Sequence, residues 1–352
     1  MNTPSRLAPG IASALAAAVL FGASTPFAKA LLGHVAAVAL AGLLYLGAGA
    51  GLLGVWLWRR TRDAGTGLIE RQDVPWLVSA IVFGGVLGPI LLMFGLSRMS
   101  AANGSLLLNL ENVFTALVAW FVFHEHHDRR MVVGMVLIAL AGALLTGQAY
   151  TRPVSILGPL AVMGACLCWA LDNNLTRRVS VGDPVAIAAV KGVAAGSVNT
   201  AVALLLGEPF PSFSTGAAAA LVGFLGYGVS LALFVTALRH IGTARTSTYF
   251  SAAPFVGAVI ALLWLHENAS AVFWVAAGLM VAGLWLHLAE RHAHIHRHET
   301  LVHSHRHMHD VHHQHAHDFP WDSREPHVHR HVHEPLVHDH SHYPDIHHRH
   351  GH

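Results

Sequence analysis

The feature that most constrains this chain is a series of long apolar stretches within its first 290 residues. Examples are 7–32, 35–58, 75–96 and 131–147. A helix of about 20 residues, rising 1.5 Å per residue, crosses the ~30 Å hydrocarbon layer of a bilayer. Backbone groups inside lipid must bond within the protein, and helices achieve this locally. The sequence therefore predicts an all-α protein that crosses the membrane many times.

Ten spans are expected, separated by short breaks rich in charged or turn residues. Their ranges are 9–32, 35–58, 75–96, 100–123, 130–148, 156–177, 184–206, 216–238, 244–265 and 271–289. A cleavable signal peptide is the alternative for the first span, but its apolar run continues to Leu32 and further spans follow. Cys166 and Cys168, two residues apart in an apolar run, point to different helix faces and are expected in the core.

The placement of Lys and Arg predicts the orientation of the chain. With a cytoplasmic N-terminus, the cytoplasmic ends hold Arg59, Arg60, Arg62, Arg71, Arg129, Arg130, Arg177, Arg178, Arg239 and Arg245. The opposite ends hold only Lys29, Arg98 and Arg152. Because cytoplasmic loops carry the excess of basic residues, both termini are expected in the cytoplasm, in a cell (inner) membrane.

Two segments of the chain resemble each other at an offset of 142 residues. LSRMSAANGSLLLNLENVFTALVAWFVFHEH from Leu96 aligns without a gap with LRHIGTARTSTYFSAAPFVGAVIALLWLHEN from Leu238, and both carry His-Glu near the end. LFGASTPFAKA at 20–30 similarly matches CWALDNNLTRR at 168–178. Five helices per half is an odd number, so the second half enters from the opposite side. The sequence thus predicts two inverted repeats.

These motifs resemble the drug/metabolite transporter superfamily in its ten-helix form with two EamA-type domains. The resemblance covers 10–288 and rests on FGASTPFAK, CWALDNNLTRR and the two blocks that end in FHE and LHE. It implies a first repeat at 1–148, a second at 149–290 and an added tail at 291–352. The family's usual proline in these blocks is present as Pro254, whereas the first half has Asn112 there, preceded by Glu111.

Three ionisable side chains fall within predicted spans: Glu111, Asp172 and Lys191. A charge in the membrane costs about 2.5–3.5 kcal/mol on insertion scales, so each one needs a partner or a purpose. Further polar residues beside them complete a predicted substrate-binding set of Ser105, Asn109, Glu111, Asn112, Asp172, Asn173 and Lys191. We favour a central cavity that binds a cationic or polar solute or takes up a proton. The alternative is a buried network that fixes helix packing.

Other polar residues leave alternatives open. Asp172 could mark a helix end anchored at the interface, and Lys191 could snorkel to the surface or pair with Asp172 or Glu111. The paired Glu125 and Glu267 are expected to cap helices or close loops. No Walker sequence or G-x-S-x-G motif occurs, so the chain is not expected to be an enzyme, and transport would be secondary.

The last 62 residues hold 23 of the 30 histidines and no cysteine. This low-complexity tail is expected to be disordered without a ligand. In an extended chain, the two imidazoles of His-x-His lie on one side, about 6.6 Å apart, and can bind Ni, Co, Zn or Cu. The expected ligands are His303, His305, His307, His309, His327, His329, His331, His333, His338, His340 and His342. The alternative is a pH-responsive tail with incidental metal affinity.

Three functions compete at this point. The first is a secondary transporter of a small polar metabolite, the second a nickel, cobalt or zinc transporter fed by the tail, and the third a membrane-anchored metal reservoir. The first is favoured because the histidines of the front part fall at span ends or in loops. The expected partners are the lipid bilayer and a small-molecule or ion substrate, without nucleic acid; a homodimer stays open. No cofactor is required beyond the divalent metal expected in the tail.

Overall fold

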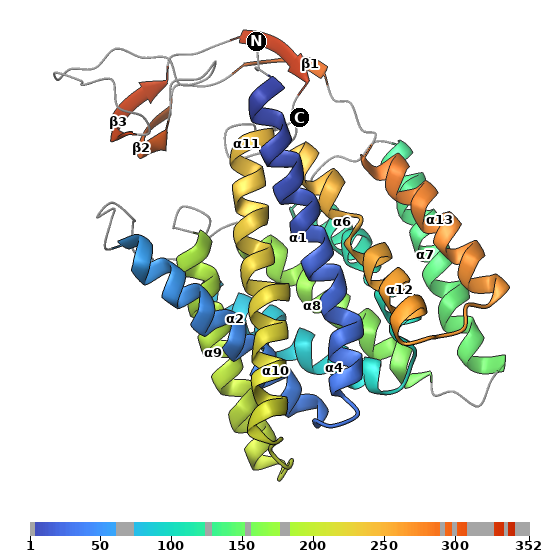
Figure 1. Cartoon of the computed structure of the whole chain (residues 1–352). Coiled ribbons are helices and arrows are strands. Elements are labelled where there is room, and N and C mark those ends of the chain that lie inside the picture. Colours follow the sequence, from blue (N-terminus) through green and yellow to red (C-terminus); the bar gives the residue numbers. More distant parts are fainter. Residues whose placement is uncertain are drawn as a thin grey trace. The chain divides into compact units, whose positions relative to one another are not determined.

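The computed structural model describes most of the helical part of the chain and four segments of the tail. The described ranges are 4–60, 74–123, 129–151, 156–176, 184–288, 293–297, 301–307, 327–333 and 337–341. The chain divides into two compact units, Met1–Ala289 and Glu290–His352. Within its described residues, the first unit is built entirely of helices (Figure 1).

The first half of the helical unit forms five transmembrane segments. They are α1 (Pro4–Leu31), α2 (Ala37–Arg60), a composite of α3 (Val74–Ala80), the π-helix η2 (Ile81–Leu87) and α4 (Gly88–Ser97), a pair made of α5 (Ala101–Leu107) and α6 (Leu110–Phe123), and α7 (Arg129–Thr151).

The second half repeats this order. Its elements are α8 (Leu157–Thr176), α9 (Pro184–Leu205), α10 (Phe213–Gly223) with the π-helix η4 (Phe224–Val229), α11 (Ser230–Phe250), α12 (Ala253–Trp264) and α13 (Ala271–Leu288). In this half, α11 passes from the third segment to the fourth through a kink at Gly242, where φ is 80°. In the described residues, eight segments are long and apolar enough to cross a membrane. With α8 and the shorter apolar α13 they match the ten predicted spans, which confirms the all-α membrane fold.

Irregular backbone recurs at matching places in the two halves. The offset of 142 residues places Gly84 of η2 on Gly226 of η4. It also places the break at Asn109, between α5 and α6, on Ser251, between α11 and α12. Each of these spans is therefore one membrane segment that contains an irregular turn or a short break. The shared irregularities follow the same inverted repeat that the sequence shows.

Pro89 explains the irregular turn in the third segment. Proline has no N–H to donate to the carbonyl four residues earlier, which belongs to Gly85. The residue before Pro89 also bonds differently from an α-helix. Gly88 N–H donates to Phe83 O, five residues back, and not to Gly84 O, four residues back. The carbonyls of Gly84 and Gly85 thus become acceptors for side chains of neighbouring helices.

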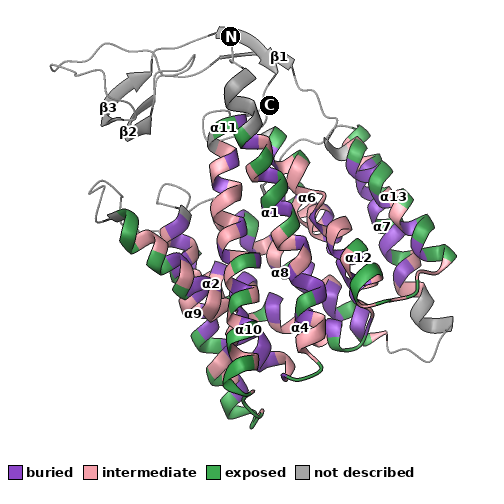
Figure 2. Ribbon diagram, in the orientation of Figure 1, coloured by how far each residue is buried: buried purple, intermediate pink, exposed green. Residues whose placement is uncertain are grey.

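Helix packing in this unit depends on small residues. Gly192 of α9 lies directly against the backbone of Gly49 in α2, and Gly22 of α1 lies against Ala253 of α12. Close backbone approach of this kind is how helices associate in lipid, where burial of apolar surface drives little. Buried and exposed residues alternate around single helices such as α2 and α13 (Figure 2). Exposed apolar side chains such as Leu263 suit contact with lipid tails.

The tail unit contains strands where the sequence predicted disorder. Strand β1 (Ala293–Arg297) pairs antiparallel with β4 (Val337–Ser341), and β2 (Leu301–His307) pairs antiparallel with β3 (His327–His333). The expectation of disorder is corrected for these four segments. The period of two that the His-x-His pattern imposes is also the period of a strand, and pairing satisfies the backbone groups.

Candidate functional site

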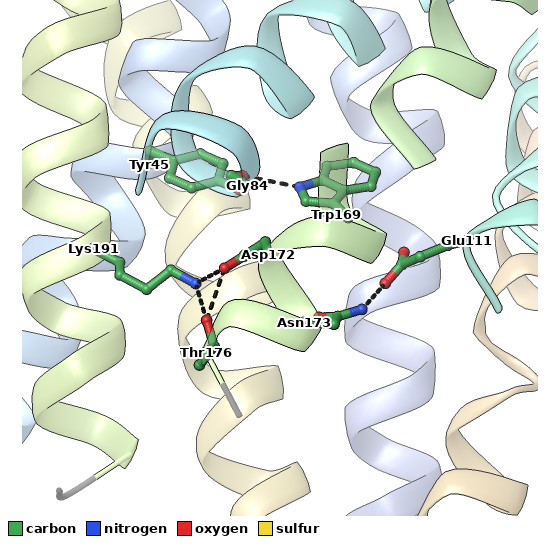
Figure 3. A network of polar contacts seen from close by, with 8 residues as sticks. All are labelled: Tyr45, Gly84, Glu111, Trp169, Asp172, Asn173, Thr176 and Lys191. Atoms are coloured by element: carbon green, nitrogen blue, oxygen red, sulfur yellow. Dashed lines mark hydrogen bonds and ion pairs between the residues drawn. The ribbon is translucent and has the colours of Figure 1, made fainter. Parts of the chain in front are cut away.

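Five polar residues from three helices gather in the helical unit and are called the polar centre below. They are Glu111 of α6, Asp172, Asn173 and Thr176 of α8, and Lys191 of α9 (Figure 3). Consecutive residues of α8 point in different directions. Asp172 faces α9, whereas Asn173 faces α6, so α8 divides the centre into two bonded groups.

The first group is an ion pair completed by a hydroxyl. Lys191 Nζ lies 2.5 Å from Asp172 Oδ1, and the two side chains are only 16% and 12% exposed. Thr176 Oγ1 donates to Asp172 Oδ1 at 2.8 Å and accepts from Lys191 Nζ at 3.1 Å. Of the two partners that the sequence left open for Lys191, the structure selects Asp172. Each charge is thereby compensated inside the membrane.

The second group carries a carboxylate held by an amide. Asn173 Nδ2 donates to Glu111 Oε1 at 2.8 Å. Glu111 is half-buried and Asn173 is exposed, so this group is reachable from outside the helix core. A carboxylate has about four acceptor positions, and one amide donor uses one of them. The arrangement leaves Glu111 able to bind a cationic group or a proton.

Aromatic side chains border the polar centre and hold the irregular turn of η2. The Tyr45 hydroxyl and the Trp169 indole N–H both donate to Gly84 O, at 2.8 and 3.0 Å (Figure 3). The ring of Tyr45 lies 5.6 Å from that of Tyr227, between centroids. None of these aromatic residues belongs to the predicted substrate-binding set. The sequence signal for them is the pair Gly84 and Gly85, five and four residues before Pro89, which predicts carbonyls without a donor in their own helix.

The backbone of η2 packs closely against α8 and α9 at Gly84 and Gly85. Asn199, fully buried in α9, donates through Nδ2 to Gly85 O at 3.0 Å. A Cβ atom added to Gly84 would overlap the carboxylate of Asp172. The ion pair therefore lies directly against the backbone of η2.

Three residues of the predicted substrate-binding set lie outside the polar centre. Asn109 is fully buried, and its Nδ2 donates to Leu106 O at 3.0 Å and lies 3.7 Å from Met280 Sδ. Ser105 is 1% exposed and faces Gly257 of α12. Asn112 is half-buried on α6. Ser105 lies in α5 and Glu111 in α6, on opposite sides of the break at Asn109.

The predicted metal ligands belong to the tail. His303, His305 and His307 lie on β2, His327, His329, His331 and His333 on β3, and His338 and His340 on β4, whereas His309 and His342 fall outside the described residues. Among the side chains that the structure describes, no group of three His, Cys, Asp or Glu residues is arranged to hold a metal ion.

The family profile of EamA-like transporters matches the chain twice, at residues 8–147 and 156–289. The two matches together cover more than half of the sequence. The chain belongs to the EamA-like transporter family. Residues 8–147 contain Glu111, and residues 156–289 contain Asp172 and Lys191, so the polar centre of this EamA-like protein is built from both repeats.

Similar proteins include two transporters without an assigned solute. An uncharacterized transporter of Methanothermobacter thermautotrophicus is 28% identical over 301 residues, which cover 79% of this chain and 85% of the relative. The uncharacterized transporter YyaM of Bacillus subtilis is 26% identical over 207 residues, covering 54% of this chain and 66% of the relative.

A shorter relative matches only part of the chain. The probable 4-amino-4-deoxy-L-arabinose-phosphoundecaprenol flippase subunit ArnE of Pseudomonas paraeruginosa is 38% identical over 116 residues, 98% of its own length and 32% of this chain. A solved crystal structure is 19% identical in sequence, and the match covers 81% of this chain and 96% of the solved chain, with a TM-score of 0.57. That likeness supports the fold alone.

Proposed function

We propose that this EamA-like protein is a secondary transporter that moves a small polar metabolite across the cell membrane by alternating access. The observation that carries the proposal is the Glu111 carboxylate, held by Asn173 within the membrane-spanning helices and reachable from outside the core. Asp172 already has a cationic partner in Lys191. Glu111, in the described part of the chain, is bonded to a neutral amide, so it is the group free to bind a solute cation or a proton.

The distribution of basic residues supports a proposed orientation. The ends of α2 and α8 and the beginning of α7 lie on one face of the helical unit, and this face carries the arginine excess. We assign it to the cytoplasm, which places the protein in the cell (inner) membrane with both termini inside. The ends of α1, α4 and α12 then lie on the opposite, outer face.

The test of this proposal uses Glu111→Gln, which keeps the size of the side chain and removes its charge. Cells that express the protein are compared with cells that express the variant by profiling small solutes inside the cells and in the medium. We expect at least one polar solute to shift with the native protein, and the shift to fall about tenfold in the variant because a charge-assisted contact is lost.

A change in nickel, cobalt or zinc content instead of an organic solute would replace this proposal by metal transport. If no solute and no metal differed between the native protein, Glu111→Gln and cells without the protein, the transport proposal would be lost. Equal expression of the two proteins in the membrane fraction is the control.

The strand register of the tail favours divalent-metal binding as a second function. In the β2–β3 pair, His303 is opposite His331, His305 is opposite His329, and His307 is opposite His327. Residues that face each other across antiparallel strands have Cα atoms about 4.5–5.5 Å apart. The register thus brings histidines from two chain segments to neighbouring positions, and neutral imidazole suits Zn, Ni, Co and Cu. We propose that the tail collects such ions, with transport as a separate activity.

Metal binding by the tail should depend on pH. Imidazole binds metal only when neutral, and its pKa is about 6.5, so affinity should be present at pH 7.5 and lost as the pH falls below about 6. Calorimetric titration of purified full-length protein with Zn²⁺ or Ni²⁺ is expected to show several bound ions, and a variant that ends at Glu290 should bind none of them. Equal binding by the two proteins would exclude the tail as the site.

A further inference from the structure

We propose that Glu267 is a latch that closes the outer face of this transporter, and that the latch must open when the polar centre turns outward. The inference rests on the alternating access proposed above. It concerns a residue outside the polar centre, at the end of the second repeat's His-Glu motif. The matching Glu125 lies outside the described residues.

The latch consists of two short hydrogen bonds from backbone to carboxylate. Ala101 N–H donates to Glu267 Oε1 and Ala102 N–H donates to Glu267 Oε2, both at 2.7 Å. Ala101 and Ala102 begin α5, where backbone N–H groups have no partner within the helix and carry partial positive charge. One carboxylate therefore satisfies two such donors at once, which is the stronger class of hydrogen bond.

These bonds join the two repeats across the outer face. Glu267 follows α12 in the second repeat, whereas α5 belongs to the first. His266, just before Glu267, has a φ of 52°, a left-handed conformation that is uncommon outside glycine. The backbone thus adopts an unfavourable conformation where it presents the carboxylate. A strained backbone conformation of this kind is kept where the surrounding contacts hold it in place.

A seal of small residues lies between the latch and the polar centre. Gly22 of α1 and Gly257 of α12 approach each other backbone to backbone, and a Cβ atom added to Gly257 would lie 2.8 Å from Ser105 Oγ of α5. Ser105 belongs to α5, whose first residues bond to Glu267, and Glu111 follows in α6, beyond the break at Asn109. A solute that moves between Glu111 and the outer face must therefore separate α5 from α1 and α12.

A buried polar atom at the seal disfavours this closed arrangement. Ser105 Oγ has no hydrogen-bond partner in the described part of the chain. A buried polar atom without a partner is destabilising, and water that enters on opening would satisfy it. The closed seal therefore requires a compensating interaction, which the Glu267 bonds supply. A segment that switches between two stable states needs one interaction that favours the closed state and another that favours the open state.

Cysteine labelling distinguishes a moving latch from a permanent helix cap. In a background with Cys166→Ala and Cys168→Ala, one reporter is Ser105→Cys, behind the seal, and the other is Asn173→Cys, at the exposed side of the polar centre. The rate of reaction with a water-soluble maleimide is measured for each reporter in lipid nanodiscs. Glu267→Gln is expected to raise the rate at position 105 about fivefold, since a charged cap is weakened, and to lower it at position 173.

The matched control is Glu208→Gln. Glu208 Oε2 accepts from Ala39 N–H at 2.8 Å near the beginning of α2, so it is also a carboxylate cap on the outer face, but it does not hold α5. We expect both labelling rates to stay unchanged in this variant. Glu267→Asp, which keeps the charge on a shorter side chain, should give intermediate rates and serves if Glu267→Gln does not fold.

Rates that rise at both positions, or at neither, would overturn the latch and leave Glu267 as a structural cap. The labelling is measured without a solute, so opposite changes in the two labelling rates would support the latch even if no transported solute were found. If the transport proposal held and the latch did not, the Glu267→Gln protein would transport the solute at the native rate.

Discussion

Replacement of Lys191 by methionine is expected to lower the free energy of unfolding by about 3–5 kcal/mol. The reason is that Asp172 would be left as an uncompensated charge between α8 and α9, with only 12% of its side chain exposed. The Thr176 hydroxyl would remain as a donor at 2.8 Å, but a neutral hydroxyl does not replace an ammonium group. Denaturant titration of the purified proteins in the same detergent measures the difference.

The double variant Asp172→Asn with Lys191→Met is the matched control. It removes both charges, so most of the lost stability should return, because a missing pair is much less costly than a broken one. Transport should not return with it if the pair has a role in the cycle. Equal destabilisation in the single and double variants would show that the 2.5 Å contact carries no coupling energy.

Gly84→Ala is the second change with a large expected effect. The added methyl group would overlap the carboxylate of Asp172, so the ion pair, the η2 backbone or both must move. Overpacking of this kind typically costs about 1–3 kcal/mol. The same shift would disturb Gly84 O, which accepts from Tyr45 and Trp169. We expect a lower melting temperature and loss of transport together.

Gly147→Ala provides the comparison. Gly147 lies in α7, and a Cβ atom there would meet nothing within 4 Å. Alanine is the better helix former, so this variant should be as stable as the native protein or slightly more stable. If Gly84→Ala behaved like Gly147→Ala in thermal unfolding, the close contact between η2 and Asp172 would be wrong.

The ten spans and the inverted repeat were predictable because both depend on local properties. Apolar length identifies a span wherever it occurs, and an offset of 142 residues can be read from the letters. Pairing between helices is different. The contact of Lys191 with Asp172, rather than Glu111, depends on how α9 packs against α8, and no periodicity in the sequence specifies that packing.

The repeat also shows why the polar centre is asymmetric. The alignment of 20–30 with 168–178 places Ser24 at the position of Asp172. The structure preserves this match, since Gly226 of η4 lies against Ser24 as Gly84 of η2 lies against Asp172. One repeat thus carries the charge, and the other a hydroxyl. The backbone geometry is shared between the halves, whereas the chemistry is found in only one of them.

Two local features of the backbone differ from what the sequence predicted. The predicted substrate-binding set grouped Ser105, Asn109 and Asn112 with Glu111, but the helix is interrupted at Asn109, between α5 and α6. Composition predicted disorder in the tail, yet the alternation of histidines has the period of a strand, and β1 to β4 form two antiparallel pairs.

The most direct test of the central claim is flux of the solute found by profiling into proteoliposomes that contain purified protein. The native protein and Glu208→Gln, whose carboxylate lies outside the polar centre, should both catalyse uptake. Glu111→Gln should be slower by about tenfold, the expected effect of losing one charge-assisted contact. Uptake by Glu111→Gln at the native rate would contradict a transport site built around Glu111.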